Sequence, residues 1–345
     1  MNDKKSLISL SLNKSEDEYR YIKAISYSAI SKYLREGFKC ISTLYEKEES
    51  PSLTFGSLVD TMVLSPDEFN KKFILSDKAF PSENIRDIIK NIYNRTTGEY
   101  GLLSDIPKEI ILEEANNASY CMTFKDDTRV KKIIDNGESY YGFLTISNGK
   151  QIIDHDTYAS ASMVRDAINN TKFIEFFFRP YYPNGYDGFN QVQFITDFDG
   201  VPFKCMFDRI IVSHKDKVII PVDLKTCSVP EYEFHKNFVK YHYDVQARLY
   251  TMILQKVIST DDYYKDFKIA DFDFVCVNKE SLTPICWKFN PQIDKKEVEY
   301  ENGINFCDPI KVGAELYSYL INNPKVPSGI DLLSSNNIED FIKMM

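Results

Sequence analysis

The sequence is poor in glycine, with 13 of 345 residues, and this scarcity argues against an architecture built on glycine-rich phosphate loops. Walker loops, GxGxxG, GxSxG and HExxH patterns are absent, so the enzyme classes built on them are set aside. No apolar run approaches the roughly 18 residues of a membrane span. The N-terminus is too polar for a signal peptide, and we expect a cytoplasmic protein without a membrane anchor.

Cysteine and histidine patterns that bind metals are missing as well. The seven cysteines are dispersed without a CxxC pair, which fits reduced thiols better than a disulfide framework. The four histidines do not pair with cysteine at finger spacing, so we expect no zinc.

The net charge is −9, whereas a nucleic-acid-binding domain is usually basic. Nucleic-acid binding would therefore require lysine and arginine to gather in one groove.

A folded core is well supplied, since 43% of the residues are hydrophobic and 14% are aromatic. The patterns predict helices up to residue 178, interrupted near 96–101 and at Pro107, with a hairpin over 140–154 that turns at Asn148-Gly149. Strands are expected over 190–197, 201–212, 217–226, 272–280 and 285–290, and helices over 241–259 and 295–321. This order predicts an α/β fold with a central mixed β-sheet flanked by helices and a helical N-terminal part.

The domain organisation expected from this pattern is simple. We predict a flexible arm over 1–23, one domain over 24–330 and a C-terminal tail over 331–345. Within the domain, a helical part over 24–180 precedes a β core with its helices over 190–325.

Charged residues interrupt two neighbouring apolar strands between Met206 and Lys225. Side chains alternate along a strand, so Asp223 and Lys225 project together while Leu224 points into the core. A hairpin that aligns Asp208 with this pair would place two carboxylates and one ammonium around a single point. That set suits a magnesium ion held against a phosphodiester, and it indicates a metal-dependent nuclease.

Together with a following QxxxY helix, this pattern resembles the PD-(D/E)xK nuclease superfamily, and within it the phage exonucleases of the RecE and lambda type. The further matches are an SxSxxxxL start at Ser26, a GxxxH-like segment from Gly56 to Asp60 followed by LSPDEF, Gln191 before the hairpin, and Gln246 and Tyr250. The likeness runs from about residue 24 to 325. The order and spacing of the motifs carry the likeness, because each motif alone is unspecific.

The resemblance implies a role for each matching residue. Asp208, Asp223 and the Leu224 carbonyl would hold Mg²⁺, with Mn²⁺ as a substitute, and Asp60 and Gln191 would complete the shell. Lys225 would orient the attacking water and stabilise the charge on phosphate. Gln246 and Tyr250 would position DNA or brace the site. Some RecB-like nucleases also carry an iron–sulfur cluster, but the cysteines at 276, 286 and 307 are too widely spaced for one.

Two positions depart from the family pattern. Asp60 replaces the histidine of GxxxH and still offers an oxygen ligand, whereas Gln191 replaces a glutamate and offers only a neutral carbonyl. Gln193 lies on the same predicted strand face and could substitute for Gln191. These departures put activity in question more than fold.

Ordinary structural explanations stand beside these assignments. Asp208 could form a turn, Asp60 could lie on a helix surface, and Tyr250 could be a core residue. Three basic residues of the first helix could contact DNA, although a solvated charged face explains them more simply: Lys32, Arg35 and Lys39.

The resemblance implies a Mg²⁺-dependent exonuclease that degrades linear double-stranded DNA from 5′ to 3′ in recombination or DNA processing, in a bacterial or phage-infected cytoplasm. Its expected partners are DNA, a single-strand annealing protein and further copies of itself, and no membrane. Two alternatives remain open. One is a weakened nuclease fold that serves as a nucleic-acid-binding or structural module, and the other is a repair endonuclease.

Overall fold

The computed structural model describes residues 4–44, 50–183, 185–292 and 308–322. The chain divides into two compact units, one formed by residues 1–56 and 164–345 and the other by residues 57–163. Helices α3 (Pro51–Leu64) and α8 (His155–Asn170) run from one unit into the other. The single domain over 24–330 stays a prediction, and the expected tail over 331–345 lies outside the described residues.

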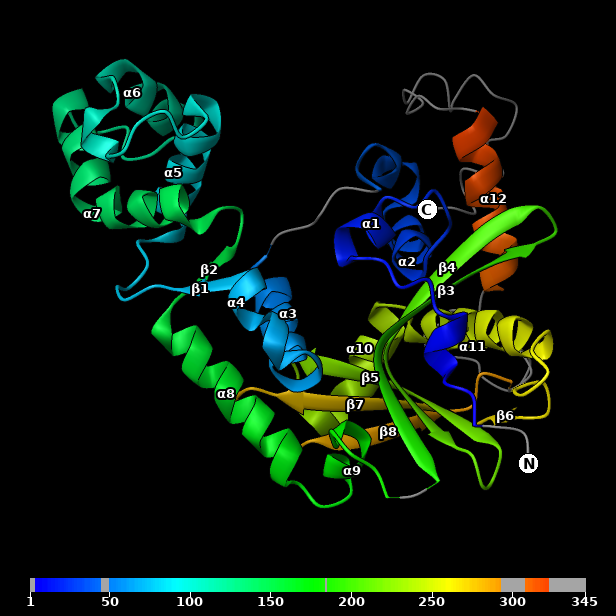
Figure 1. Ribbon diagram of the computed structural model, residues 1–345. Coiled ribbons are helices and arrows are strands. Elements are labelled where there is room, and N and C mark those ends of the chain that lie inside the picture. Colours follow the sequence, from blue (N-terminus) through cyan, green and yellow to red (C-terminus); the bar gives the residue numbers. More distant parts are fainter. Residues whose placement is uncertain (1–3, 45–49, 184, 293–307, 323–345) are drawn as a thin grey trace. The chain divides into compact units, whose positions relative to one another are not determined.

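A mixed β-sheet forms the centre of the first unit (Figure 1). The antiparallel strands β3, β4 and β5 are followed by β7, parallel to β5, and by the antiparallel β8, while the short β6 also pairs with β5. This arrangement confirms the fold class expected from the sequence. The strands are β3 (Tyr186–Phe198), β4 (Val201–Ser213), β5 (Val218–Cys227), β6 (Lys268–Ile269), β7 (Phe272–Asn278) and β8 (Ile285–Phe289).

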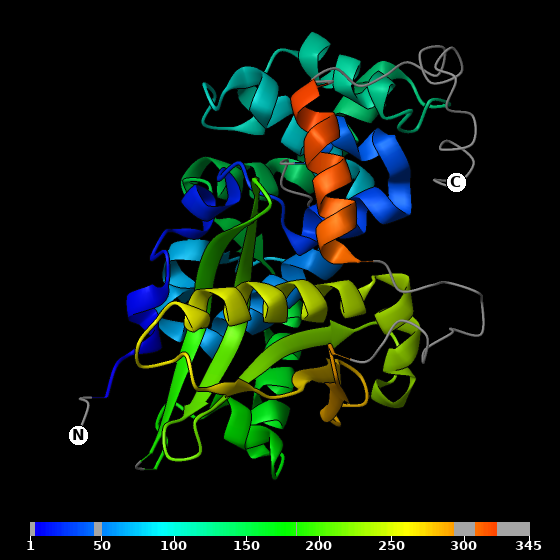
Figure 2. The ribbon, with the colours of Figure 1, turned by 90° about the vertical axis from the view of Figure 1, so that its right-hand side faces the viewer.

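Helices cover this sheet, and Figure 2 shows α11 running across one of its faces. The chain reaches the parallel strand β7 through α10 and α11, because a parallel connection requires a crossover. Phe207, Phe272 and Phe274 of the strands are buried with Leu249 and Ile253 of α11. The helical elements are η1 (Leu7–Leu10), α1 (Glu16–Arg20), α2 (Tyr27–Glu36), η2 (Gly37–Thr43), α9 (Ile174–Phe178), η5 (Glu231–Glu233), α10 (Phe234–Lys240), α11 (Tyr243–Ser259) and α12 (Pro309–Asn322).

The second unit is helical around a small core of its own. Isoleucines of α5, at 85, 88, 89 and 92, pack with residues of α6 and α7, as their helical spacing predicts. Its elements are η3 (Pro66–Glu68), α4 (Phe69–Lys72), β1 (Phe73–Leu75), α5 (Glu83–Thr96), η4 (Leu103–Asp105), α6 (Lys108–Asn117), α7 (Asp126–Ser147) and β2 (Gln151–Ile153).

The hairpin predicted over 140–154 was wrong. Residues up to Ser147 belong to α7, and β2 pairs in parallel with β1 rather than with a preceding strand. Asn148 and Gly149 both have positive φ, 49° and 80°, and end the helix. Left-handed residues suit a helix C-terminus as well as a hairpin turn, so the Asn-Gly pair alone does not separate the two.

The N-terminal segment, for which the sequence predicts a flexible arm, packs against the sheet over residues 4–23. Leu7 is fully buried, and the N–H of Leu12 donates to the carbonyl of Gln193 at 3.0 Å. The buried ammonium of Lys204 donates to the carbonyls of Tyr19, Arg20 and Ile22 at 2.8–2.9 Å. Those carbonyls lie in the last turn of α1 and just after it, where a cation is electrostatically favoured.

None of the helices in the described ranges is long and apolar enough to cross a membrane. The six described cysteines are free thiols, and Cys307 lies outside the described residues. The start of the helix expected over 295–321 also lies outside them, and its later part is α12.

Candidate active site

Strands β4 and β5 separate at the point where the predicted carboxylates lie. The antiparallel ladder ends at the pair Arg209–Val222, and continuing that register places Asp208 opposite Asp223. Instead of the next ladder bond, Oδ2 of Asp208 accepts the N–H of Leu224 at 2.9 Å. The side chain thus satisfies a backbone donor at the fork, and the two carboxylates lie on neighbouring strands at one register position.

Asp223 is held from two sides. It is 2% exposed, and Nε2 of Gln246 donates to its Oδ1 at 2.5 Å. The ammonium of Lys225 lies 2.6 Å from Oδ2, an ion pair without the angles of a hydrogen bond. Leu224 is 3% exposed and points away from this pair into the core, as strand alternation predicts. The structure therefore brings together Asp208, Asp223, Lys225 and Gln246.

The ammonium of Lys225 also lies over an aromatic ring that the sequence argument missed. Its Nζ is 4.7 Å from the ring centroid of Tyr243. Burial acts to lower the pKa of Lys225, but Asp223 and, to a smaller extent, Tyr243 and Asp208 together outweigh burial and hold that pKa well above its ordinary value. Tyr243 stands three residues before Gln246 on α11, a spacing that puts both on one helix face and could have revealed it.

Tyr250, one turn after Gln246, is a core residue in this structure. It is 8% exposed, and its ring packs edge-on against Phe207 at 5.0 Å between centroids. Burial raises the pKa of its hydroxyl, so the group stays protonated. Its side chain braces the sheet beneath the site, and a catalytic role remains a prediction.

Gln191 lies opposite Asp208 at a break in the β3–β4 ladder. The register pairs Asn190 with Arg209 and Val192 with Phe207, skipping the position between them. Gln191 has a positive φ of 51°, which an ordinary strand residue avoids, and its side chain is half-buried. The backbone distortion therefore falls at the position where the resemblance to PD-(D/E)xK exonucleases predicts a glutamate.

Gln193, the alternative to Gln191, has a different set of partners. Its amide donates to the carbonyl of Lys14 at 2.9 Å and accepts the Lys14 N–H at 3.1 Å. These bonds attach the N-terminal segment to the edge strand β3. Asp60 is half-buried on the part of α3 that belongs to the second unit, and its role as a ligand stays a prediction.

The three basic residues predicted to contact DNA do not form one exposed helix face. Lys32 is 8% exposed, and its ammonium donates to the carbonyl of Thr43 at 3.3 Å. Arg35 is exposed near the end of α2, and Lys39 is exposed in the following turn η2. Only Arg35 and Lys39 therefore present charge to solvent.

The donor atoms at the fork fit a hard, hydrated cation. Buried Oε1 of Gln246 accepts no hydrogen bond in the described part of the chain, and neither does Oδ2 of Asp223. Within the described residues no three His, Cys, Asp or Glu side chains cluster as a metal cage would require. Mg²⁺ is commonly bound by one or two carboxylates and keeps several waters. A pair of aspartates therefore suits Mg²⁺ better than it suits a metal that needs a cage of protein ligands.

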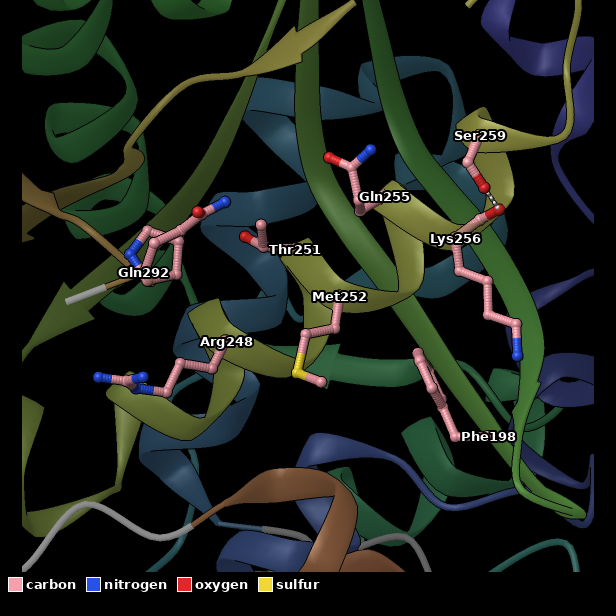
Figure 3. Close-up of a pocket in the computed structure, with 9 residues that line it drawn as sticks. Phe198, Arg248, Thr251, Met252, Gln255, Lys256, Ser259 and Gln292 are labelled. Carbon is pink, nitrogen blue, oxygen red and sulfur yellow. Dashed lines mark hydrogen bonds between the residues drawn. The ribbon is translucent and has the colours of Figure 1, made fainter. Parts of the chain in front are cut away.

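The outer side of α11 carries a separate groove of about 500 Å³, lined by apolar as well as polar side chains. Arg248, Thr251, Gln255 and Ser259 of the helix line it, with Gln292 after β8 (Figure 3). Lys256 at its rim donates to the carbonyl of Asp197. Gln246 faces the sheet instead, so the groove is distinct from the fork.

Comparison with known proteins identifies a family for this chain. Residues 37–286 match a family described as a PDDEXK-like domain of unknown function (DUF3799). No curated protein matches the sequence. A solved structure named "Putative exonuclease", from Eubacterium rectale, is similar with a TM-score of 0.41 and 12% identity over 94% of this chain and 97% of that one. The chain belongs to the PDDEXK-like DUF3799 family and thus to the PD-(D/E)xK nuclease superfamily.

Proposed function

We propose that this protein is a metal-dependent deoxyribonuclease that degrades linear double-stranded DNA as an exonuclease, from 5′ to 3′. The observation that carries the proposal is the ion pair of the buried Asp223 with the half-buried Lys225, beside Asp208 at the strand fork. A buried carboxylate is costly for a fold to retain, and such groups concentrate at functional sites. Membership of a nuclease superfamily supports the same reading.

The residues present would hold a metal at the fork. Asp208, Asp223 and the Leu224 carbonyl would bind Mg²⁺ or Mn²⁺, with Gln191 as a further ligand. The bound cation would lower the pKa of a water and neutralise charge on the phosphate.

The protein groups around this position have tasks of their own. Lys225, charged throughout the physiological range, donates to the attacking water or to a phosphate oxygen. Gln246 fixes the Asp223 carboxylate by donating to Oδ1, so that Oδ2, which pairs with Lys225, would be available to a bound cation. Tyr250 keeps α11 packed on the sheet, so that Gln246 stays at this distance. Arg35 and Lys39 are proposed to contact the DNA backbone.

The direction, the linear substrate and the partners rest on the resemblance to RecE- and lambda-type exonucleases. By that resemblance the protein acts in recombination or DNA processing, as a homo-oligomer and beside a single-strand annealing protein. We place it in the cytoplasm for the same reason.

Digestion of DNA tests the proposal. Linear 5′-phosphorylated duplex and closed circular duplex are incubated with Mg²⁺, with Mn²⁺ or with EDTA, and released mononucleotides are measured. Asp223→Asn should abolish release, because it removes the charge and keeps the shape. Asp262→Asn is the matched control, since Asp262 is fully exposed. Cleavage of closed circles would identify an endonuclease instead.

A second candidate is a nucleic-acid-binding module without catalysis. The neutral Gln191 opposite Asp208 favours it, because the third acidic ligand is missing there. Absence of cleavage with duplex, single-stranded and RNA substrates in both metals would support this candidate. Cleavage that disappears in Lys225→Ala would eliminate it.

A further inference from the structure

Two exposed cations converge on one aromatic ring close to the fork. The guanidinium of Arg35, in the last turn of α2, lies 5.8 Å from the ring centroid of Tyr241. The ammonium of Lys240, the last residue of α10, lies 5.1 Å from the same centroid. These three side chains, the Arg35–Tyr241–Lys240 cluster, come from segments about 200 residues apart in the sequence and are brought together by the fold.

Hydrogen bonds fix the cluster to the first helix. The Tyr241 carbonyl accepts from the hydroxyl of Tyr27 at 2.7 Å and from that of Ser31 at 2.9 Å. The Tyr241 ring is 5.8 Å from the ring of Tyr243, on which the Lys225 ammonium lies at 4.7 Å. A continuous row of rings and cations therefore leads from the cluster to the proposed catalytic lysine.

The charge of the cluster is not compensated within the described chain. Neither Arg35 nor Lys240 forms an ion pair with a carboxylate there, whereas Lys236, on the same helix α10, lies 2.6 Å from Glu233. The helix dipoles favour a cation at the C-terminal ends of α2 and α10, where Arg35 and Lys240 lie. Both residues are exposed, so their charges remain accessible to a ligand. Burial and then Arg35 lower the pKa of the neighbouring His242, so this histidine adds no charge near pH 7.

An anion is what such a site lacks, in a chain whose net charge is −9. A peptide carboxylate could neutralise the cluster, but only a nucleic-acid strand that also passes Lys225 would contact the whole row of rings and cations. Resting on the proposed function, we infer that the Arg35–Tyr241–Lys240 cluster binds a backbone phosphate of the DNA strand, next to the phosphodiester at Lys225. Phosphate contacts carry no sequence information, so binding here is independent of base sequence.

The salt dependence of DNA affinity in EDTA tests this inference without any cleavage. Fluorescence anisotropy of a labelled duplex gives the affinity at several salt concentrations for the wild type, Arg35→Gln, Lys240→Gln and the double variant. Lys236→Gln is the matched control, since it removes a paired lysine from the same helix. Loss of this one phosphate contact in the double variant should reduce the slope of log affinity against log salt by about 0.9, and each single variant should reduce it by part of that.

The expected result is a reduced slope for both single variants, a further reduction in the double variant, and the wild-type slope for Lys236→Gln, on two unrelated duplex sequences. Unchanged slopes, an equal change in Lys236→Gln, or no DNA binding by the wild type would overturn the inference. The binding assay contains no metal, so unchanged slopes would contradict this inference without contradicting the proposed nuclease activity. Conversely, a failure to cleave DNA in the digestion assay would not contradict a reduced slope in the binding assay.

Discussion

Replacing Lys225 by methionine should cost stability as well as activity. At an effective dielectric constant of about 20, charges 2.6 Å apart attract by about 6 kcal/mol, and much of this offsets the desolvation of the two groups. The Asp223 side chain is 3% exposed, so water cannot replace the lost ammonium. Removing one partner of a buried pair typically costs about 3–5 kcal/mol, and we expect a loss of that size in the free energy of unfolding.

Urea unfolding in EDTA, followed by circular dichroism, measures this loss. The double variant Asp223→Asn with Lys225→Met should recover to within about 2 kcal/mol of the wild type, because neutral replacements of buried pairs are often tolerated. It should remain inactive. Mg²⁺ should stabilise Lys225→Met more than the wild type, since the cation replaces the missing charge. A wild-type unfolding midpoint for Lys225→Met would refute the reasoning that the ammonium compensates a buried carboxylate.

Three further changes test other parts of the structure. Burial raises the pKa of Asp244 to about 6, above the ordinary 3.8, so the folded state prefers the protonated acid and loses stability as pH rises from about 4 to 6. Asp244→Asn should therefore raise the free energy of unfolding by about 2–3 kcal/mol at pH 8 and by little at pH 4, and equal effects at both pH values would contradict this. Lys204→Met should lower the free energy of unfolding by about 2–3 kcal/mol, because three carbonyls lose their hydrogen-bond donor. It should also expose residues 4–23 to limited proteolysis. An unchanged digestion pattern would show that Lys204 does not hold this segment in place. Gln191→Glu should tighten Mg²⁺ binding by about tenfold, because it places a charged oxygen opposite Asp208; calorimetry on the DNA-free protein would detect this, and unchanged affinity would remove Gln191 from the ligand set.

Local patterns carried much of the fold. Strand alternation correctly paired Asp223 with Lys225 and turned Leu224 inward, and the apolar runs located the five longer strands to within a few residues. Helical spacing put Gln246 and Tyr250 on one face of the helix, and the structure shows that Gln246 on that face reaches Asp223. Asn148-Gly149 was misread because the same positive φ values end a helix or turn a hairpin, and the choice depends on what packs against the preceding residues.

The sequence by itself determined which residues carry charge into apolar strands, since buried charge stands out against its neighbours. Only the tertiary structure decided that Tyr243 lies under the Lys225 ammonium, that Gln193 binds the N-terminal segment, and that Arg35 meets Lys240 over Tyr241. These contacts join segments distant in sequence, and their geometry is set by how helices pack on the sheet. Periodicity along a single segment contains no information about that packing.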